Sequence, residues 1–283
     1  MTIAVTGATG HLGRLVVEAL ISRGVAPGEI VAAVRDTGKA ARLAALGVQV
    51  READYDRPET LATAFAGIDR LLLISGNEVG KRVPQHTAAI EAARAAGVGF
   101  LAYTSILRAD TTRVGLAPEH LATEQVIAAA GIPFALLRNG WYIENYTGQF
   151  GTALSTGAFL GSARDGRIAA ATRADFAEAA AAVLLSAEPG VYELGGEAFT
   201  MAELAAEVAR QSGTPVEYRD LPVAEYQAVL VGAGLPEQYA GLLADTDTKI
   251  AEGELDTDSD DLTRLIGRPA TSLADAVATA LKN

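Results

Sequence analysis

The chain of 283 residues contains no cysteine and only three histidines. Without cysteine it has no disulfide framework, no thiolate nucleophile and no cysteine-based metal site. His11, His86 and His120 are the only imidazoles in the sequence, so structural zinc is not expected. We predict no metal site.

Positive charge is also scarce, since 23 lysines and arginines stand against 35 aspartates and glutamates, a formal net charge of -12. This balance argues against a broad basic face for nucleic acid or anionic lipid, and it favours a small-molecule partner. No apolar run is long enough to span a bilayer, and the first strand begins too early to leave room for a signal peptide. We expect a cytoplasmic protein that binds neither nucleic acid nor membranes.

Hydrophobic residues make up 49% of the chain, enough for a large core. In the first half, short apolar runs alternate with helical segments. This alternation predicts the α/β class, a Rossmann-type doubly wound parallel sheet with right-handed crossovers. The expected strands are residues 3–5, 30–34, 48–50, 71–74, 100–104 and 134–138.

Past residue 138 the alternation changes, and we expect a smaller α+β C-terminal lobe. Residues 157–167 are Gly-rich and predict a mobile loop, an Ala-rich helix at about 172–187 returns to the sheet, and strands are expected at 192–194 and 216–218. Thr200 and Glu203 have capping-box spacing, and Ser272 with Asp275 is a weaker example. We therefore divide the chain into an NAD(P)-binding Rossmann domain, residues 1–146 with the return helix, and a substrate-binding lobe, residues 147–283.

Residues 245–261 form a dense acidic run. Paired carboxylates could indicate calcium, but the spacing lacks the glycine and the terminal glutamate of an EF-hand loop. We expect a solvated face instead.

The most informative motif is the glycine-rich stretch between the first strand and the first helix. Gly7 can adopt a backbone conformation closed to other residues, Gly10 lets the chain approach a diphosphate, and Gly13 lets the helix pack close to its strand. Free N–H groups at the helix start then point at the anion. The flanking strand and amphipathic helix supply the context that this motif requires. The cofactor contacts expected here are Gly7, Thr9, Gly10, His11, Leu12 and Gly13.

The second strand ends in Arg35, where NAD-binding chains carry an acidic residue for the ribose hydroxyls. A guanidinium there would pair with a 2′-phosphate and stack on adenine, which favours NADPH, with NADH as a weaker alternative. Asp36 follows immediately and argues the other way. Further contacts are expected beside the adenine, from Asp54 and Tyr55, and beneath the nicotinamide ribose, from Ser75, Gly76 and Asn77.

Residues 139–146 place aromatic and amide side chains directly after a strand end, where open parallel sheets bind ligands. The Tyr-x-x-x-Lys pair of short-chain dehydrogenase/reductases is absent, because Leu116 and His120 stand at the matching positions. Carbonyl reduction and sugar epimerisation, which need that phenol, lose support. Hydride transfer to an acceptor that is already strongly electrophilic needs no such acid.

Residues 6–13, 73–80, 102–105, 119–124 and 137–146 together resemble the NmrA-like atypical short-chain dehydrogenase/reductases, and the likeness continues through 172–175 and 265–267. The family includes quinone oxidoreductases and triphenylmethane dye reductases. The resemblance implies NADPH bound by the Gly loop, Arg35, residues 75–77 and the segment that begins at Asn139, with a quinone near the nicotinamide. The contacts that it adds are Thr104, Asn139, Gly140, Trp141, Tyr142 and Glu144.

The function expected is therefore NADPH-dependent reduction of a quinone to the hydroquinone. The quinone would lie against the side chains of Trp141, Tyr142, Asn145 and Phe150. Water or His120 would supply the proton, and the alternative for His120 is a hydrogen bond to a ribose hydroxyl or a backbone carbonyl. Two other functions stay open, a redox-sensing regulator without turnover and a reductase of another electrophile such as a triarylmethane dye. A homodimer is a candidate oligomeric state.

Overall fold

The computed structural model describes residues 1–282. Seven parallel strands form its main sheet, in the order β3-β2-β1-β4-β5-β6-β8. The order reverses between β1 and β4, which is the switch point of a doubly wound sheet and confirms the predicted Rossmann-type architecture. The strands are β1 (Ile3–Thr6), β2 (Ile30–Val34), β3 (Gln49–Glu52), β4 (Arg70–Leu73), β5 (Phe100–Ile106), β6 (Phe134–Asn139) and β8 (Gly190–Leu194).

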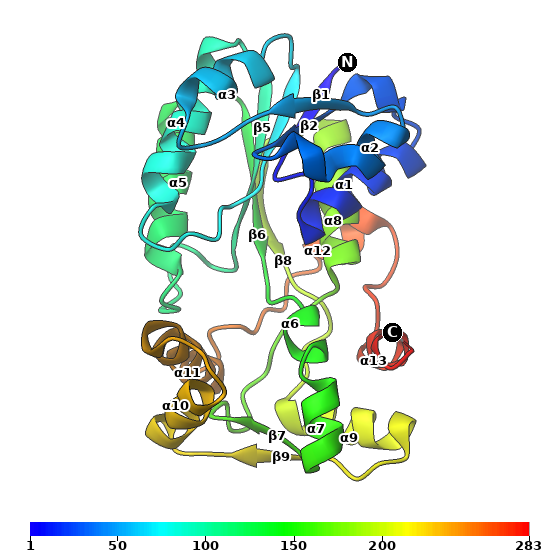
Figure 1. Cartoon of the computed structure of the whole chain (residues 1–283), viewed down its shortest axis with the longest axis vertical. Helices are drawn as coiled ribbons and strands as arrows, with labels where there is room; N and C mark the ends of the chain where they lie inside the picture. Colours follow the sequence, from blue (N-terminus) through cyan, green and yellow to red (C-terminus); the bar gives the residue numbers. More distant parts are fainter. Residues whose placement is uncertain (283) are drawn as a thin grey trace.

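Helices cover both faces of this sheet (Figure 1). One face packs against α1 (His11–Ser22), α2 (Ala41–Ala45), α8 (Arg173–Ser186) and α12 (Asp261–Ile266). The other packs against α3 (Pro58–Ala64), α4 (Arg82–Ala95) and α5 (Ala117–Ala129). Two short 3-10 helices, η1 (Pro27–Glu29) and η2 (Thr37–Ala40), flank β2.

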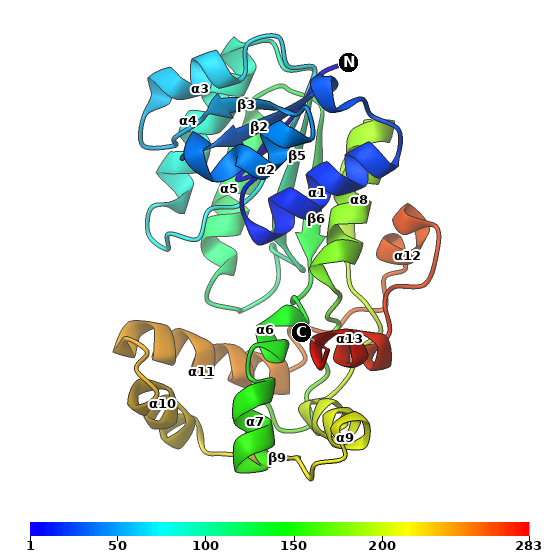
Figure 2. The ribbon, with the colours of Figure 1, turned by 45° about the vertical axis from the view of Figure 1, so that its right-hand side comes forward.

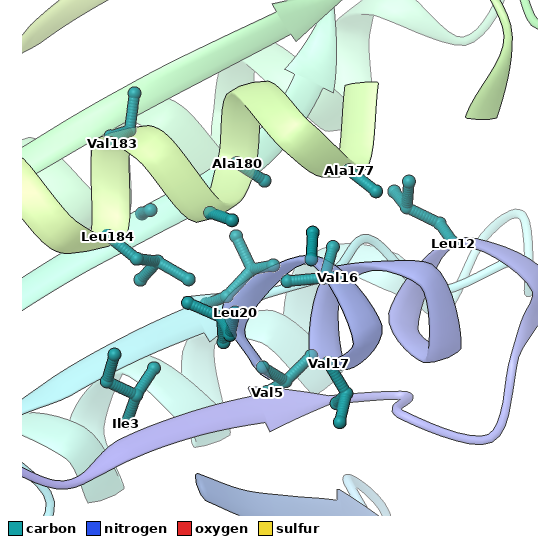
Figure 3. Close-up of a cluster of buried hydrophobic side chains, with 14 of the residues drawn as sticks. Ile3, Val5, Leu12, Val16, Val17, Leu20, Ala177, Ala180, Val183 and Leu184 are labelled. Carbon is teal, nitrogen blue, oxygen red and sulfur yellow. The ribbon is translucent and has the colours of Figure 1, made fainter. Parts of the chain in front are cut away.

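The packing of α1 on α8 anchors the glycine loop to the core (Figure 3). Val16 and Leu20 of α1 are completely buried between β1 and α8. On α8 the facing residues include Ala177 and Ala180, whose small side chains allow the two helices to approach closely. The first turn of α1 is therefore held in place by the apolar core.

The smaller lobe lies below the carboxyl ends of the strands (Figures 1 and 2). Its two strands pair in parallel, and Thr200 forms the predicted capping box with Glu203, as Ser272 caps the last helix. The elements are α6 (Glu144–Thr147), α7 (Phe150–Thr156), β7 (Ala158–Gly161), α9 (Met201–Ser212), β9 (Glu217–Asp220), α10 (Val223–Gly232), α11 (Glu237–Ala251) and α13 (Leu273–Ala280).

Three predictions for the C-terminal half need correction. The strand expected at 192–194 is β8, and it extends the main sheet beside β6 instead of belonging to the lobe, because Tyr192 and Leu194 pack into the core under α8. Residues 158–161, inside the expected mobile loop, form β7, since an apolar run lies between the flanking glycines. The acidic run is only partly solvated, because Asp247 faces inward from α11 and Glu254 is buried against Arg113.

The chain crosses between the two parts after β6, before α8, after β8, and before and after α12 (Figures 1 and 2). We call this crossing region the waist. Here backbone segments touch: a Cβ added to Gly140 would lie 2.5 Å from the carbonyl oxygen of Ala169, and one added to Gly196 would lie 2.3 Å from that of Ala170. The division at residue 146 stays a prediction. None of the helices described between residues 1 and 282 is long and apolar enough to cross a membrane.

Candidate functional site

Gly7 and Gly13 are each required by the backbone geometry around the start of α1. Gly7 has a φ of +57°, in the left-handed region, and its carbonyl oxygen accepts a 2.9 Å hydrogen bond from Gly10 N. A Cβ on Gly13 would lie 2.4 Å from that same oxygen. Gly10 is the N-cap of α1 and supplies no side-chain cap, so the first N–H groups of the helix face the cavity without one.

This loop opens onto a cavity of about 440 Å³ at the switch point, which we call the loop pocket. The structure brings together at its walls every cofactor contact expected from the Gly loop, the second strand end and residues 54–77. These are Gly7, Thr9, Gly10, His11, Leu12, Gly13, Arg35, Asp54, Tyr55, Ser75, Gly76 and Asn77. Lys39, Glu78 and Gln85 also line it, and sequence reasoning missed them.

Two cations lie at the rim of the loop pocket beyond β2. The Arg35 side chain is 71% exposed, and its Nη1 lies 3.4 Å from Glu78 Oε1. Lys39 is 75% exposed, with Nζ 3.9 Å from Asp36 Oδ2. Asp36, which argued for NADH, accepts a 2.9 Å hydrogen bond from Gly38 N and thereby caps η2. The rim thus offers a phosphate two loosely held positive charges.

A second cavity of about 440 Å³ adjoins the first at the waist, and we call it the waist pocket. Leu12 and residues 74–77 line both cavities. The expected residues that line the waist pocket are Ser75, Gly76, Asn77, His120, Asn139, Gly140, Trp141, Tyr142 and Asn145. The sheet and the lobe both contribute to its walls, so it extends the loop pocket toward the lobe.

His120 lies in the wall of the waist pocket, and its Nδ1 is 2.9 Å from the hydroxyl of Tyr103. Burial, and secondarily the charge of Arg82, lowers the pKa of His120 to about 3. The imidazole is therefore neutral near pH 7 and is not an imidazolium acid. The partner of His120 is thus a side-chain hydroxyl rather than the backbone carbonyl offered as an alternative, and the role of His120 in catalysis stays a prediction.

A buried cation in this wall was missed from the sequence. Arg82, at the start of α4, donates from Nε to the carbonyl oxygen of Gly76 at 2.7 Å and from Nη1 to Glu119 Oε2 at 3.1 Å. His86, one turn later, accepts a 2.9 Å hydrogen bond from Gly76 N at Nε2. Both residues hold the loop after β4 in position. No motif marks them, because the contacts that position this loop are to backbone atoms of Gly76.

Trp141 and Tyr142 are both partly buried. The ring of Tyr142 meets Phe176 edge to face with centroids 5.4 Å apart, and the Arg173 guanidinium lies 4.8 Å from the Tyr142 centroid. Trp141 lines the waist pocket and also a third cavity in the lobe. Trp141 therefore borders two cavities, whereas Tyr142 borders the waist pocket.

Three expected contacts lie away from both pockets. Thr104 is buried behind the loop after β4, where its Oγ1 accepts a 2.9 Å hydrogen bond from Ser75 N. Glu144 Oε1 accepts from Arg173 N at 2.8 Å. Phe150 is in the lobe core, edge to face with Phe159, so its placement in the acceptor wall is corrected. Among residues 1–282 no three acidic or histidine side chains are grouped to hold a metal ion.

The sequence and the structure both match known proteins over essentially their full length. The chain is 51% identical to quinone oxidoreductase 2 of Escherichia coli (strain K12), over 98% of this chain and 97% of that protein. The crystal structure of the NADPH-dependent quinone oxidoreductase of Escherichia coli with NADPH aligns over 100% of both chains, at 50% identity and a TM-score of 0.96. Triphenylmethane reductase of Citrobacter sp. aligns over 100% of both chains, at 39% identity and a TM-score of 0.93. The NmrA-like family profile matches residues 1–273, and the chain belongs to that family, as the sequence motifs predicted.

Proposed function

We propose that this protein is an NADPH-dependent quinone reductase that converts a quinone to its hydroquinone. The observation that carries the proposal is the pair of adjoining pockets, which share Leu12 and residues 74–77 at the switch point of the sheet. A donor in the loop pocket and an acceptor in the waist pocket would meet at this shared wall. The full-length similarity to a quinone oxidoreductase supports the same reaction.

The loop pocket has the chemistry that a dinucleotide phosphate needs. The first N–H groups of α1 carry no side-chain cap and would hold the diphosphate. Arg35 and Lys39 would hold the 2′-phosphate, which distinguishes NADPH from NADH. When bound, NADPH supplies the hydride.

In the waist pocket the protein's own residues orient the acceptor and exclude water. Trp141 offers a ring against which a quinone would stack, and the guanidinium of Arg82, held by Gly76 and Glu119, supplies a fixed positive charge in the same wall. Because hydroquinone formation is strongly favourable, positioning carries much of the rate. Because His120 is neutral, solvent supplies the proton.

The test is NADPH oxidation with a panel of benzoquinones, naphthoquinones, azo and triarylmethane dyes, and aldehydes, followed without oxygen so that the hydroquinone accumulates. We expect one NADPH consumed for each quinone reduced, and no turnover of aldehydes. NADPH binding without turnover of any acceptor would overturn the enzyme and favour a redox-sensing regulator. Turnover of dyes alone would favour the activity named for the Citrobacter relative.

Trp141→Ala sharpens this assignment. The substitution should raise the KM for a benzoquinone by about tenfold and leave the Kd for NADPH nearly unchanged, because Trp141 lines the waist pocket and not the loop pocket. A change in melting temperature alone would mean that the ring only fills the core. Tyr142→Ala is less informative, since it also removes the contact with Phe176.

The oligomeric state and location are also proposals. We propose a cytoplasmic homodimer, and a mass near twice 29.2 kDa in sedimentation would support the dimer. A single species of 29.2 kDa would remove it.

A further inference from the structure

The smaller lobe contains a third cavity, larger than the other two, which we call the lobe chamber. It has a volume of about 700 Å³, within the usual range for small-molecule sites, and lies among α7, β7, β9, α10 and α11. Most of its wall is apolar. The apolar residues include Ala153, Phe159, Val229, Leu230, Leu235 and Leu243.

The lobe chamber adjoins the waist pocket. Trp141, Asn145, Leu243 and Thr246 line both cavities. Trp141 therefore lies at the boundary between the two cavities. A molecule whose ring stacks in the waist pocket could extend a substituent past Trp141 into the chamber without entering the loop pocket.

The apolar chamber also has a polar group without a partner. Tyr146 is only 7% exposed, and its hydroxyl is buried without a hydrogen-bond partner. Leaving a buried hydroxyl unpaired is unfavourable, so a ligand group that pairs with it gains affinity, although the ring must first move slightly because the hydroxyl itself is covered. Asp247, in the same wall, accepts one 2.8 Å hydrogen bond from Ser162 N at Oδ2. Tyr226 lies in this wall as well. Burial, and after it the charge of Asp247, raises the pKa of both Tyr146 and Tyr226, so the three groups lie near one another.

We propose that the lobe chamber binds an extended apolar substituent of the quinone, and that Tyr146 and Asp247 hydrogen-bond to a hydroxyl carried on that substituent. The inference rests on the proposed function and specifies its substrate class as quinones with a long side chain rather than bare rings. The chain would replace water along the apolar wall, while the ring remains in the waist pocket.

The first test compares three benzoquinones with the same ring: one without a chain, one with a decyl chain and one with a hydroxydecyl chain. We expect kcat/KM to rise at least about tenfold on adding the decyl chain, since several methylene groups leave water. Equal values for the three would overturn the inference and leave the proposed function standing. No turnover of any of them would overturn the proposed function instead.

Two valines of α10 offer a matched pair of variants. Val229 lines the chamber and is 37% exposed, whereas Val231 is 42% exposed and does not line it. Val229→Trp should remove most of the decyl preference by filling the chamber, and Val231→Trp should retain it. A decyl preference that survives in both would overturn the inference. If Val229→Trp fails to fold, Ala233→Phe fills the same wall from the exposed end of α10.

Tyr146→Phe tests the hydroxyl contact separately. The variant should fold, because it removes a hydroxyl that has no partner in the protein. We expect the hydroxydecyl quinone to lose about fivefold in kcat/KM relative to the decyl quinone. Tyr239→Phe, at a half-exposed position on α11 outside the chamber, is the control and should leave the ratio unchanged. An unchanged ratio in Tyr146→Phe would overturn the assignment of this hydroxyl.

Discussion

The loop pocket and the lobe chamber are built in different ways. The loop pocket is made largely by backbone: a left-handed glycine, an uncapped helix start and the ends of neighbouring strands. The lobe chamber is made by side chains from two stretches of the chain, residues 141–160 and 219–247. A backbone site requires glycines at set positions and so leaves a motif, whereas an apolar wall accepts many residues of similar size and leaves none.

The largest effect that would sharpen this contrast comes from Gly13→Ala. The added Cβ would lie 2.4 Å from the carbonyl oxygen of Gly7, so the loop or the helix must shift. We expect NADPH affinity to fall by about a hundredfold or more and stability to fall by about 1–3 kcal/mol. Calorimetric titration and thermal melts measure the two effects. Gly28→Ala, where a Cβ meets nothing within 4 Å, is the control.

Arg35→Ala tests the charged rim of the loop pocket. A charge-assisted contact with the 2′-phosphate is worth roughly 1.5–3 kcal/mol, so the KM for NADPH should rise by about tenfold or more while that for NADH rises less. Arg42→Ala is the control, since Arg42 is exposed, pairs with Glu18 and does not line the pocket. Equal losses with both cofactors would mean that Arg35 only stacks on the adenine.

Asp247→Asn probes the lobe chamber through stability. Burial raises the pKa of Asp247 to about 6 from a usual value of 3.8, so the folded state favours the neutral carboxyl. This group's contribution to stability is fully present below pH 3.8 and is lost as the pH rises through 6. The variant should therefore gain about 1–2 kcal/mol at pH 7.5 and almost nothing at pH 4. Urea unfolding at the two pH values measures the difference.

The control for this variant is Asp245→Asn, at an exposed position on the same helix. It should change stability little at either pH. Equal gains from the two variants would show that the net negative charge of the chain, and not the buried chamber wall, sets the effect.

The smallest expected effect concerns the pH dependence of kcat, in which we expect no titration of His120. Because burial lowers the pKa of His120 to about 3, kcat for a quinone should show no ionisation of this residue between pH 5 and 8. His120→Asn should change kcat by only a few fold and leave the shape of the pH profile unchanged. A limb near pH 6.5 that disappears in the variant would return His120 to the role of proton donor.

The sequence predicted the loop pocket well and the rest of the site less well. Glycine spacing and strand ends located residues that do line one cavity, because a parallel sheet brings its carboxyl ends to one edge. Lys39 was missed because no sequence pattern distinguishes it from other lysines on the surface of a helix. Arg82 was missed because it bonds to the backbone oxygen of Gly76. Phe150 was misplaced because an aromatic residue near a strand end fits either a core or a site.

The prediction also failed where tertiary contacts decide the outcome. A short apolar run at 190–194 fits an edge of either part, and only pairing with β6 places it in the main sheet. The acidic run appeared solvated because charge predicts exposure, yet Asp247 turns inward toward Ser162. The functional prediction did not depend on these elements, because it rested on the family resemblance, which the full-length match confirms.

The repeated crossings at the waist affect how this protein can be truncated. A fragment that ends at residue 146 would lack β8 and α8, so Val16 and Leu20 of α1 would lose their cover and β6 would become an open edge. The chain also connects the two parts at several crossings. Cleavage of one surface loop should therefore not separate the lobe from the rest of the protein. Graft and deletion experiments should therefore exchange side chains of the lobe within an intact polypeptide.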